Sequence, residues 1–134
     1  MQQLPHGAPA RVLAFGAYLK NRACLIDGDQ VSWSPLHGDL DDAASRLALE
    51  QSVQRLQGAA SGPLHAVAHD LHPDFYSTRL ALRLADRWQL PAIGVQHHHA
   101  HSAVVLAECA LKGPVIALAL DGMGLGDDGQ AWGG

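Results

Sequence analysis

The sequence predicts an α/β fold, with a mixed sheet that begins as a three-strand meander and continues with alternating helices and strands. The first indication is a series of short apolar runs in the first third of the chain, two of them joined by Asp27-Gly28-Asp29, a strong hairpin signal. The second is the order that follows, in which apolar residues at helical spacing alternate with short continuous apolar runs. The third is size, because 134 residues that are 48% hydrophobic are enough for one domain with its own core.

The first half of the chain is expected to form a tail, three strands and a helix. Residues 1–10 contain two prolines and a glycine and are expected to be a linker tail. The aspartates after Gly38 suit a helix N-terminus, and this helix is expected to run to about Gln57, before Gly58. The three strands of the meander are expected at residues 11–17, 22–26 and 30–34.

The second half is expected to alternate between strands and helices. A helix is expected at residues 77–89, where apolar side chains recur at four-residue spacing up to Trp88. A second helix is expected at residues 97–112 and is broken by Gly113-Pro114. The strands, each a short apolar run, are expected at residues 64–69, 92–96 and 115–120.

The charge and the hydropathy pattern exclude some classes of partner. A formal net charge of −4 argues against a nucleic-acid surface, which ordinarily shows clustered lysines and arginines. No apolar run approaches the roughly 20 residues that a membrane span needs. The N-terminus lacks the basic and then apolar pattern of a signal peptide. The cytoplasm is therefore the expected compartment, with neither nucleic acid nor membrane as a partner.

Four of the nine histidines lie between Val95 and His101. If a helix begins near His97, then His97 and His101 lie one turn apart on the same face, where two imidazoles can bind one metal ion. His98 and His99 point in other directions around the helix axis. Solvated histidines or a purification tag are the alternatives, although the run is internal and interrupted. A catalytic metal usually has three protein ligands, so a further ligand, expected to be a carboxylate, must come from elsewhere.

A glycine-rich loop follows the last predicted strand, where α/β proteins place ligand contacts. Residues 121–129 hold four glycines and three aspartates. Glycines allow close backbone approach, so that amides can line a phosphate, and a carboxylate can hold its magnesium ion. The candidate phosphate-binding residues are Asp121, Gly122, Gly124 and Gly126. The alternative is a polar turn or a calcium-like loop, because glycine and aspartate are common turn residues.

Two shorter stretches are further candidates. Lys20 and Asn21 lie in the turn after the first predicted strand and are placed to meet a phosphate or a carbamoyl-like amide, although a single exposed lysine is ordinary. His69, Asp70 and His72 lie where the strand predicted at residues 64–69 ends, and they form a candidate polar cluster at its carboxyl end. The alternative for this cluster is a turn that caps the next helix.

Taken together in chain order, these stretches resemble the HypF carbamoyltransferases of nickel-iron hydrogenase maturation. The resemblance runs from Val12 to Gly134, and its order and spacing make it specific, although Tyr18 stands where an acidic residue is expected. It implies that residues 11–134 form the first, ribonuclease-H-like lobe of an actin-like ATPase domain, incomplete because the second lobe is absent. The matching segments are Leu19-Lys20-Asn21, Gly38-Asp39-Leu40, Ala68 to Asp74 with Ser77-Thr78-Arg79, Val95 to His101, and Ala119 to Gly134.

For the activity, the resemblance implies that carbamoyl phosphate and ATP yield carbamoyl-adenylate, whose carbamoyl group passes to the C-terminal cysteine of a partner, HypE. Dehydration there gives cyanide ligands. By the family's His-x-x-x-His pattern, His97 and His101 would hold iron or zinc, with a further carboxylate expected from the second lobe. Lys20 and the loop 121–129 would face the nucleotide phosphates and their magnesium. The alternative is a non-catalytic lobe that binds metal or docks a partner without turnover.

Overall fold

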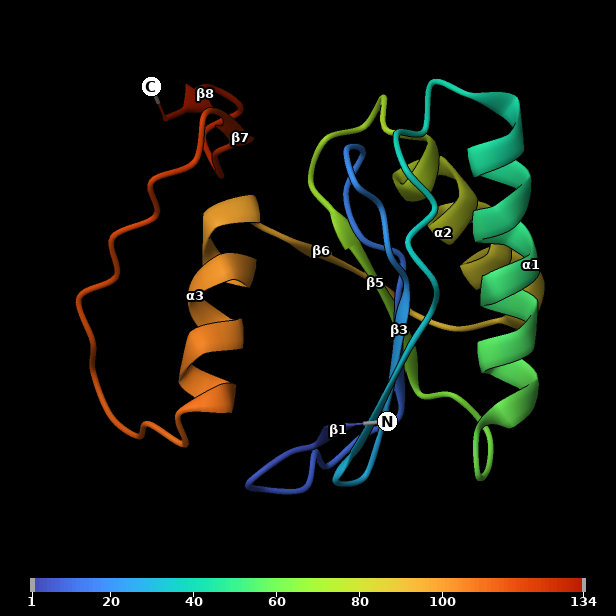
Figure 1. Ribbon diagram of the computed structural model, residues 1–134, viewed down its shortest axis with the longest axis horizontal. Helices are drawn as coiled ribbons and strands as arrows, with labels where there is room; N and C mark the ends of the chain where they lie inside the picture. Colours follow the sequence, from blue (N-terminus) through green and yellow to red (C-terminus); the bar gives the residue numbers. More distant parts are fainter. Residues whose placement is uncertain (1, 134) are drawn as a thin grey trace.

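The computed structural model describes residues 2–133 and arranges them around one mixed sheet, with helices on both of its faces (Figure 1). The chain order of the elements is β1 (Gln2–Gln3), β2 (Val12–Ala14), β3 (Cys24–Asp27), β4 (Gln30–Trp33), α1 (Ala43–Ala59), β5 (Ala66–Asp70), α2 (Tyr76–Trp88), β6 (Ala92–Val95), α3 (His97–Glu108), β7 (Gly124–Leu125) and β8 (Ala131–Trp132).

The six-stranded sheet has the strand order β1-β4-β3-β2-β5-β6. β2, β3 and β4 are antiparallel neighbours, as the predicted meander requires, and Gly28, at a φ of 64°, lies in the turn between β3 and β4. β5 runs parallel to β2, and β6 runs parallel to β5, because a helix crosses over before each of them. A mixed sheet with three helices confirms the predicted α/β class.

The predicted linker tail at residues 1–10 is partly tied to the sheet. Gln2 and Gln3 pair with Val31 and Gln30 in an antiparallel register, so β1 becomes an edge strand beside β4. The side chain of Gln3 also donates a hydrogen bond to Asp29, at 2.8 Å. Ladder hydrogen bonds thus hold two residues for which composition alone predicts a free tail.

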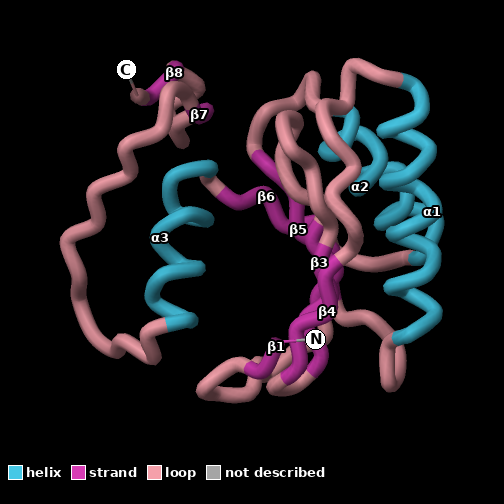
Figure 2. The backbone as a smooth tube through the Cα atoms, in the orientation of Figure 1, coloured by secondary structure: helices cyan, strands magenta, loops and turns pink. Residues whose placement is uncertain are grey.

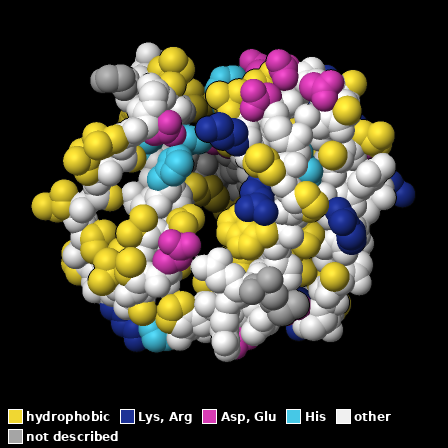
Figure 3. All heavy atoms as spheres, in the orientation of Figure 1, with side chains coloured by type: hydrophobic (Ala, Val, Ile, Leu, Met, Phe, Trp, Pro, Cys, Tyr) yellow, Lys and Arg dark blue, Asp and Glu magenta, His cyan; other side chains and the backbone are white. Residues whose placement is uncertain are grey.

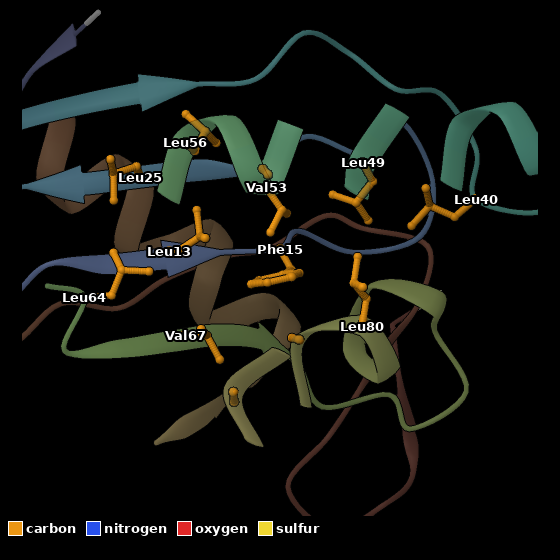
Figure 4. Packing of buried hydrophobic residues seen from close by; sticks show 13 residues of the cluster. Leu13, Phe15, Leu25, Leu40, Leu49, Val53, Leu56, Leu64, Val67 and Leu80 are labelled. Atoms are coloured by element: carbon orange, nitrogen blue, oxygen red, sulfur yellow. The ribbon is translucent and has the colours of Figure 1, made fainter. Parts of the chain in front are cut away.

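One face of the sheet carries the apolar core. The core includes Leu13 in β2, Phe15 just after β2 and Val67 in β5. These side chains point toward Val53 of α1 and Leu80 of α2 (Figure 4). Successive residues of a strand face opposite sides, so the neighbours of these core residues face away from α1 and α2. On that opposite side of the sheet lies α3 (Figure 2).

Helix α1 begins later than predicted. Asp42 is its N-cap, and the carboxylate accepts a hydrogen bond from the amide of Ser45 at 3.1 Å. Gly38 and Leu40 precede the helix, and Leu40 is buried in the core. The carboxylate of Asp39 instead accepts a hydrogen bond from the amide of Lys20 at 2.9 Å. Asp39, which was predicted to begin the helix, therefore connects the loop before α1 to the turn after β2.

Helix α3 ends at Glu108 rather than at the predicted residue 112. Ala110 adopts a left-handed conformation with a φ of 51°, and its amide donates to the carbonyl of Ala107. The amide of Leu111 donates to the carbonyl of Leu106 at 3.0 Å. These two hydrogen bonds form a Schellman motif, which closes the helix before Gly113-Pro114 is reached.

The predicted strand at residues 115–120 is wrong. This segment contains no strand, and Leu118 and Leu120 are 83% and 88% exposed. A buried strand needs neighbours for its amides and carbonyls, and no strand within residues 2–133 pairs with it. The segment instead passes outside α3 toward the small β7-β8 hairpin (Figure 1).

The three helices differ in polarity and length. Within residues 2–133, none of them combines the length and the apolar character that crossing a membrane requires.

Candidate metal centre

The candidate site lies at the carboxyl ends of two parallel strands. Asp70 is the last residue of β5, and β6 ends at Val95, two residues before His97. β5 and β6 run in parallel, and Asp70 at the end of β5 pairs with Val95 at the end of β6. Both strands therefore leave the sheet at the same edge. Gln96 caps α3, its side-chain oxygen accepting from the amide of His99 at 2.7 Å. The sequence thus fixes the first turn of α3 beside Asp70.

The histidines of α3 separate into a convergent pair and two others. His97 and His101 share a face, with their Nε2 atoms 3.3 Å apart and their ring centroids 5.0 Å apart. His98 instead lies near the side chain of Gln96, its Nδ1 3.2 Å from the amide nitrogen, and His99 is exposed. Only the pair at four-residue spacing presents two nitrogen atoms to one point.

Asp121 completes the cluster from the C-terminal segment. Its Oδ2 lies 2.8 Å from Nε2 of His97 and 3.1 Å from Nε2 of His101. The carboxylate beside the histidines therefore comes from within residues 2–133, whereas the family resemblance led us to expect it from a second lobe. Asp121 was predicted as a phosphate-binding residue, and its contact with the histidines was not predicted.

The three ligand atoms of His97, His101 and Asp121 fit a single metal ion. They all lie within 4.8 Å of one another. Ligand atoms about 2.1 Å from a tetrahedral zinc ion are roughly 3.4 Å apart, so the side chains need to separate by only a few tenths of an ångström. Two imidazoles and a carboxylate are a donor set that zinc and iron(II) accept, and three protein ligands leave a coordination position open.

Asp70 supports the cluster from behind. Its Oδ2 lies 2.7 Å from Nδ1 of His97, and its other carboxylate oxygen accepts from the amide of His72 at 2.9 Å. Asp70 is buried, so this geometry is fixed. A carboxylate that accepts from Nδ1 leaves Nε2 free as a ligand and sets the orientation of the ring.

The two carboxylates also set the charge of the centre. Burial alone would lower the pKa of His97, but hydrogen bonds to Asp70 and Asp121, together with the charges of these carboxylates, raise that pKa above its ordinary value. The pKa of Asp121 is lowered by its hydrogen bonds to His97 and to the amide of Gly122. Both shifts favour the charged forms, a protonated His97 and an ionised Asp121.

The glycines of the predicted phosphate loop have different surroundings. A Cβ atom on Gly124 would lie 2.7 Å from Cβ of His97 and 2.8 Å from His98, so glycine lets β7 approach α3 closely. A Cβ atom on Gly126 would collide with the ring of Trp132. A Cβ atom on Gly122 would meet open space. Packing therefore gives Gly124 and Gly126 a structural reason, and phosphate binding at Gly122, Gly124 and Gly126 stays a prediction.

The turn after β2 lies beside the centre. Asn21 is buried, and its amide nitrogen donates to the carbonyls of Phe15 and Ala17 at 2.9 and 2.7 Å, which gives it a structural role. Lys20 is exposed and has a left-handed φ of 47°. Its predicted contact with nucleotide phosphates, shared with the loop 121–129, stays a prediction.

His69 and His72 lie on either side of Asp70. Nδ1 of His69 is 2.7 Å from the carbonyl oxygen of Asp70. His72 accepts from the amide of Asp74 through Nδ1 and stacks on Phe75 with ring centroids 4.3 Å apart. His72 therefore belongs to the turn before α2, which is the structural alternative that the sequence left open, and His69 stays near the metal centre.

A cavity of about 320 Å³ adjoins the centre, between α3 and the sheet. Small side chains form much of its wall, with Arg22 and Trp33 on the side of the meander. Figure 3 shows a hollow in this region, with histidine side chains and lysine or arginine side chains near its rim. The lining next to the cluster includes Gly16, Ala17, His69, Asp70, His97 and His101.

Replacing Asp70 with asparagine is expected to weaken the affinity for zinc about 10–100-fold, the usual effect of losing a carboxylate behind a ligating histidine. The amide cannot hold the Nδ1–H of His97 as the charged oxygen does. Calorimetric titration with zinc measures the change. Asp74→Asn is the matched control, because Asp74 is exposed and pairs with Arg79. Equal affinities for the two variants would mean that Asp70 does not orient His97.

Comparisons with known proteins connect this geometry to a family. A family model described as the HypF Kae1-like domain matches residues 7–108. A carbamoyltransferase HypF homolog of Cupriavidus necator is 63% identical over 134 residues, which are 99% of this chain and 34% of that protein. Carbamoyltransferase HypF2 of the same organism is 56% identical over 123 residues, which are 92% of this chain and 15% of that protein.

Two solved structures share the fold. A crystal structure of full-length HypF in its phosphate- and nucleotide-bound form superposes with a TM-score of 0.87 at 37% identity, covering 98% of this chain and 17% of that one. The HypF of T. kodakarensis gives a TM-score of 0.88 at 32% identity, over 99% of this chain and 17% of that one. The chain thus spans about a third of one relative and about a sixth of the others. On the family model and these identities, the chain belongs to the family of HypF carbamoyltransferases.

Proposed function

We propose that this chain is the metal-binding lobe of a carbamoyltransferase domain that acts on a protein thiol. In the proposed reaction, water releases carbamate and inorganic phosphate from carbamoyl phosphate, and the carbamate attacks the α-phosphate of ATP to give carbamoyl-adenylate and pyrophosphate. The C-terminal cysteine thiolate of HypE attacks the carbamoyl carbon, a C–S bond forms and AMP leaves. Dehydration of this S-carbamoyl group gives a thiocyanate, which would be the source of the cyanide ligands of the iron centre in nickel-iron hydrogenase. We assign the lobe to the ribonuclease-H-like sheets of the actin-like ATPase superfamily.

The observation that carries this proposal is the cluster of His97, His101 and Asp121, with Asp70 behind it, in a member of the HypF family. The histidines and Asp121 would hold zinc or iron, and Asp70 would keep His97 in the tautomer that leaves Nε2 free. A bound metal ion would supply Lewis-acid polarisation of a carbonyl oxygen. The adjoining cavity has room for a small acyl group beside these residues.

The phosphate side of the site is a separate part of the proposal. Lys20 would contact nucleotide phosphates, and the backbone around Gly122 would line them, with a magnesium ion as counter-charge. The relative solved as full-length HypF in its phosphate- and nucleotide-bound form supports the ligand class. The loop and the metal cluster meet at Asp121, so both ligands would lie at one edge of the sheet.

A second candidate is a lobe that docks a partner without turnover. The exposed apolar segment at residues 115–120 favours it, because the side chains of Ile116, Leu118 and Leu120 are all exposed. In this alternative the metal cluster would stabilise the lobe, and no carbamoyl group would be transferred.

The two candidates differ in one experiment. The chain is mixed with HypE, carbamoyl phosphate, Mg·ATP, zinc or iron, and a polypeptide that carries the remaining two thirds of the Cupriavidus necator relative. Mass spectrometry of the C-terminal cysteine of HypE then reports transfer. We expect product from the mixture and none from the chain alone, since one lobe leaves the nucleotide in contact with water and poorly oriented.

The control is the same mixture with His97→Ala in the chain, which is expected to yield no product. Equal product with this variant would exclude a role for the metal cluster. Product from the unmixed chain would show that one lobe is sufficient. A mixture that assembles but transfers nothing would favour the docking lobe.

A further inference from the structure

A row of hydrogen-bonded polar side chains runs through the core from the surface of α1 to the turn after β2. His37 is almost fully buried, with Nδ1 2.8 Å from Oδ1 of Asn21 and Nε2 2.9 Å from Oγ of Ser52 on α1. Nη2 of Arg55 in turn donates to Oγ of Ser52 at 2.9 Å. Neither His37 nor Ser52 touches the metal cluster.

The partners of Asn21 fix which atoms of this row donate and which accept hydrogen bonds. Its amide nitrogen donates to the carbonyls of Phe15 and Ala17, so its Oδ1 is the accepting end. Nδ1 of His37 must then carry the proton, and Nε2 must accept from the hydroxyl of Ser52. His37 is therefore held as one neutral tautomer, with a donor on one side and an acceptor on the other.

The turn that Asn21 holds is strained. Gly16 has a φ of 69°, and a Cβ atom there would lie 2.3 Å from the carbonyl oxygen of Arg22. Lys20 adopts a left-handed φ of 47° although it is not glycine. The left-handed conformation of a residue other than glycine, such as Lys20, costs about 1–3 kcal/mol and persists only where the surroundings hold it. Gly16 and Ala17 line the cavity beside the metal cluster, so the turn forms one of its walls.

We propose that His37 is a positioning residue for ligand binding: through Asn21 it holds the turn that forms the cavity wall and carries Lys20. The ligand half of this inference rests on the proposed function, in which Lys20 meets nucleotide phosphates. His37 itself contacts no ligand, because Asn21 and Ser52 occupy both of its ring nitrogens.

The charge state of His37 follows from the same surroundings. Burial, with the charges of Arg55 and Arg22, lowers the pKa of His37 below its ordinary value of 6.5. A proton on Nε2 would face the hydroxyl of Ser52, which already receives a hydrogen bond from Arg55. The stabilisation of the turn is therefore present above pH 6.5 and is lost as the pH falls through the lowered pKa.

The test compares His37→Leu, which removes both polar contacts, with His37→Gln, whose amide offers a donor and an acceptor without titrating. Hydrogen exchange of the amides of Lys20 and Asn21, corrected for intrinsic rates, reports the turn. Titration with Mg·ATP reports ligand binding, and titration with zinc reports the metal cluster.

For His37→Leu we expect faster exchange at both amides and an affinity for Mg·ATP about tenfold lower, the equivalent of one unsatisfied buried polar group. The zinc affinity should stay the same. His37→Gln should match the wild type at pH 7.5. From pH 7.5 to 5.5 the wild-type turn should become less protected, whereas the turn of His37→Gln should not change.

Unchanged exchange in a folded His37→Leu would overturn the inference, as would a folded His37→Gln that behaves like His37→Leu. If wild-type chain does not bind Mg·ATP while exchange responds as expected, the nucleotide part of the proposed function fails and His37 still holds the turn. If Mg·ATP binds and is insensitive to both substitutions, the nucleotide site stands and the positioning role fails.

Discussion

Alanine at His97 or His101 is expected to abolish measurable zinc uptake by the chain. Either substitution leaves one imidazole and one carboxylate, which is fewer than the three protein ligands of a typical catalytic zinc site. The loss should exceed the roughly 10–100-fold effect expected for Asp70→Asn, because a ligand is removed rather than an outer partner. Calorimetric titration at pH 7.5 measures it, with bound metal checked by elemental analysis.

The neighbouring histidines provide matched controls. His98→Ala and His99→Ala remove the same side chain from the same helix turn, and most of the zinc uptake should remain, because neither ring joins the convergent pair. Asp121→Ala should resemble the His97 and His101 variants. If it binds zinc as the wild type does, the third ligand is not Asp121. Equal losses in all four histidine variants would instead point to unfolding of α3.

Local rules explain which parts of the site could be predicted. The convergence of His97 and His101 follows from helical pitch, which depends only on the intervening residues. The hairpin at Gly28 follows likewise from the turn itself. Asp121 lies 20 residues beyond His101, and its position depends on a segment that forms no helix or strand before β7. The only sequence signal for Asp121 as a third ligand was that it is a carboxylate directly after an apolar run, while the histidine pair still needed a carboxylate.

The same difference between local and long-range contacts explains the wrong strand at residues 115–120 and the structural role found for Asn21. The apolar run at residues 115–120 has the composition of a buried strand, but a strand also needs partners, and composition does not supply them. Asn21 looked like a ligand-binding residue because it follows Lys20. Its amide instead satisfies two carbonyls of the strained turn, a role that depends on backbone directions a sequence pattern does not encode.

Replacing Phe15 with alanine is expected to destabilise the chain by about 3–5 kcal/mol, the usual cost of truncating a buried phenylalanine. Phe15 is fully buried where the sheet meets α1 and α2 (Figure 4). That loss is a large fraction of the roughly 5–15 kcal/mol that stabilises a typical domain. Urea unfolding followed by circular dichroism measures it. Leu82→Ala in α2 is the control, because Leu82 is 47% exposed and should change stability by only about 0.5 kcal/mol.

The stabilisation by zinc can be compared between the Phe15→Ala variant and the wild type. A ligand that binds only the folded state adds about 2.7 kcal/mol at a concentration 100 times its dissociation constant. Phe15 packs on the α1 and α2 side of the sheet, whereas His97 and His101 lie on the α3 side, and independent sites are additive. Zinc should therefore stabilise the Phe15→Ala variant and the wild type equally. A smaller gain in the variant would mean that the core and the metal centre are coupled, either through the cavity wall at Gly16 and Ala17 or through β5, where the amide of Phe15 donates to the carbonyl of Ala68.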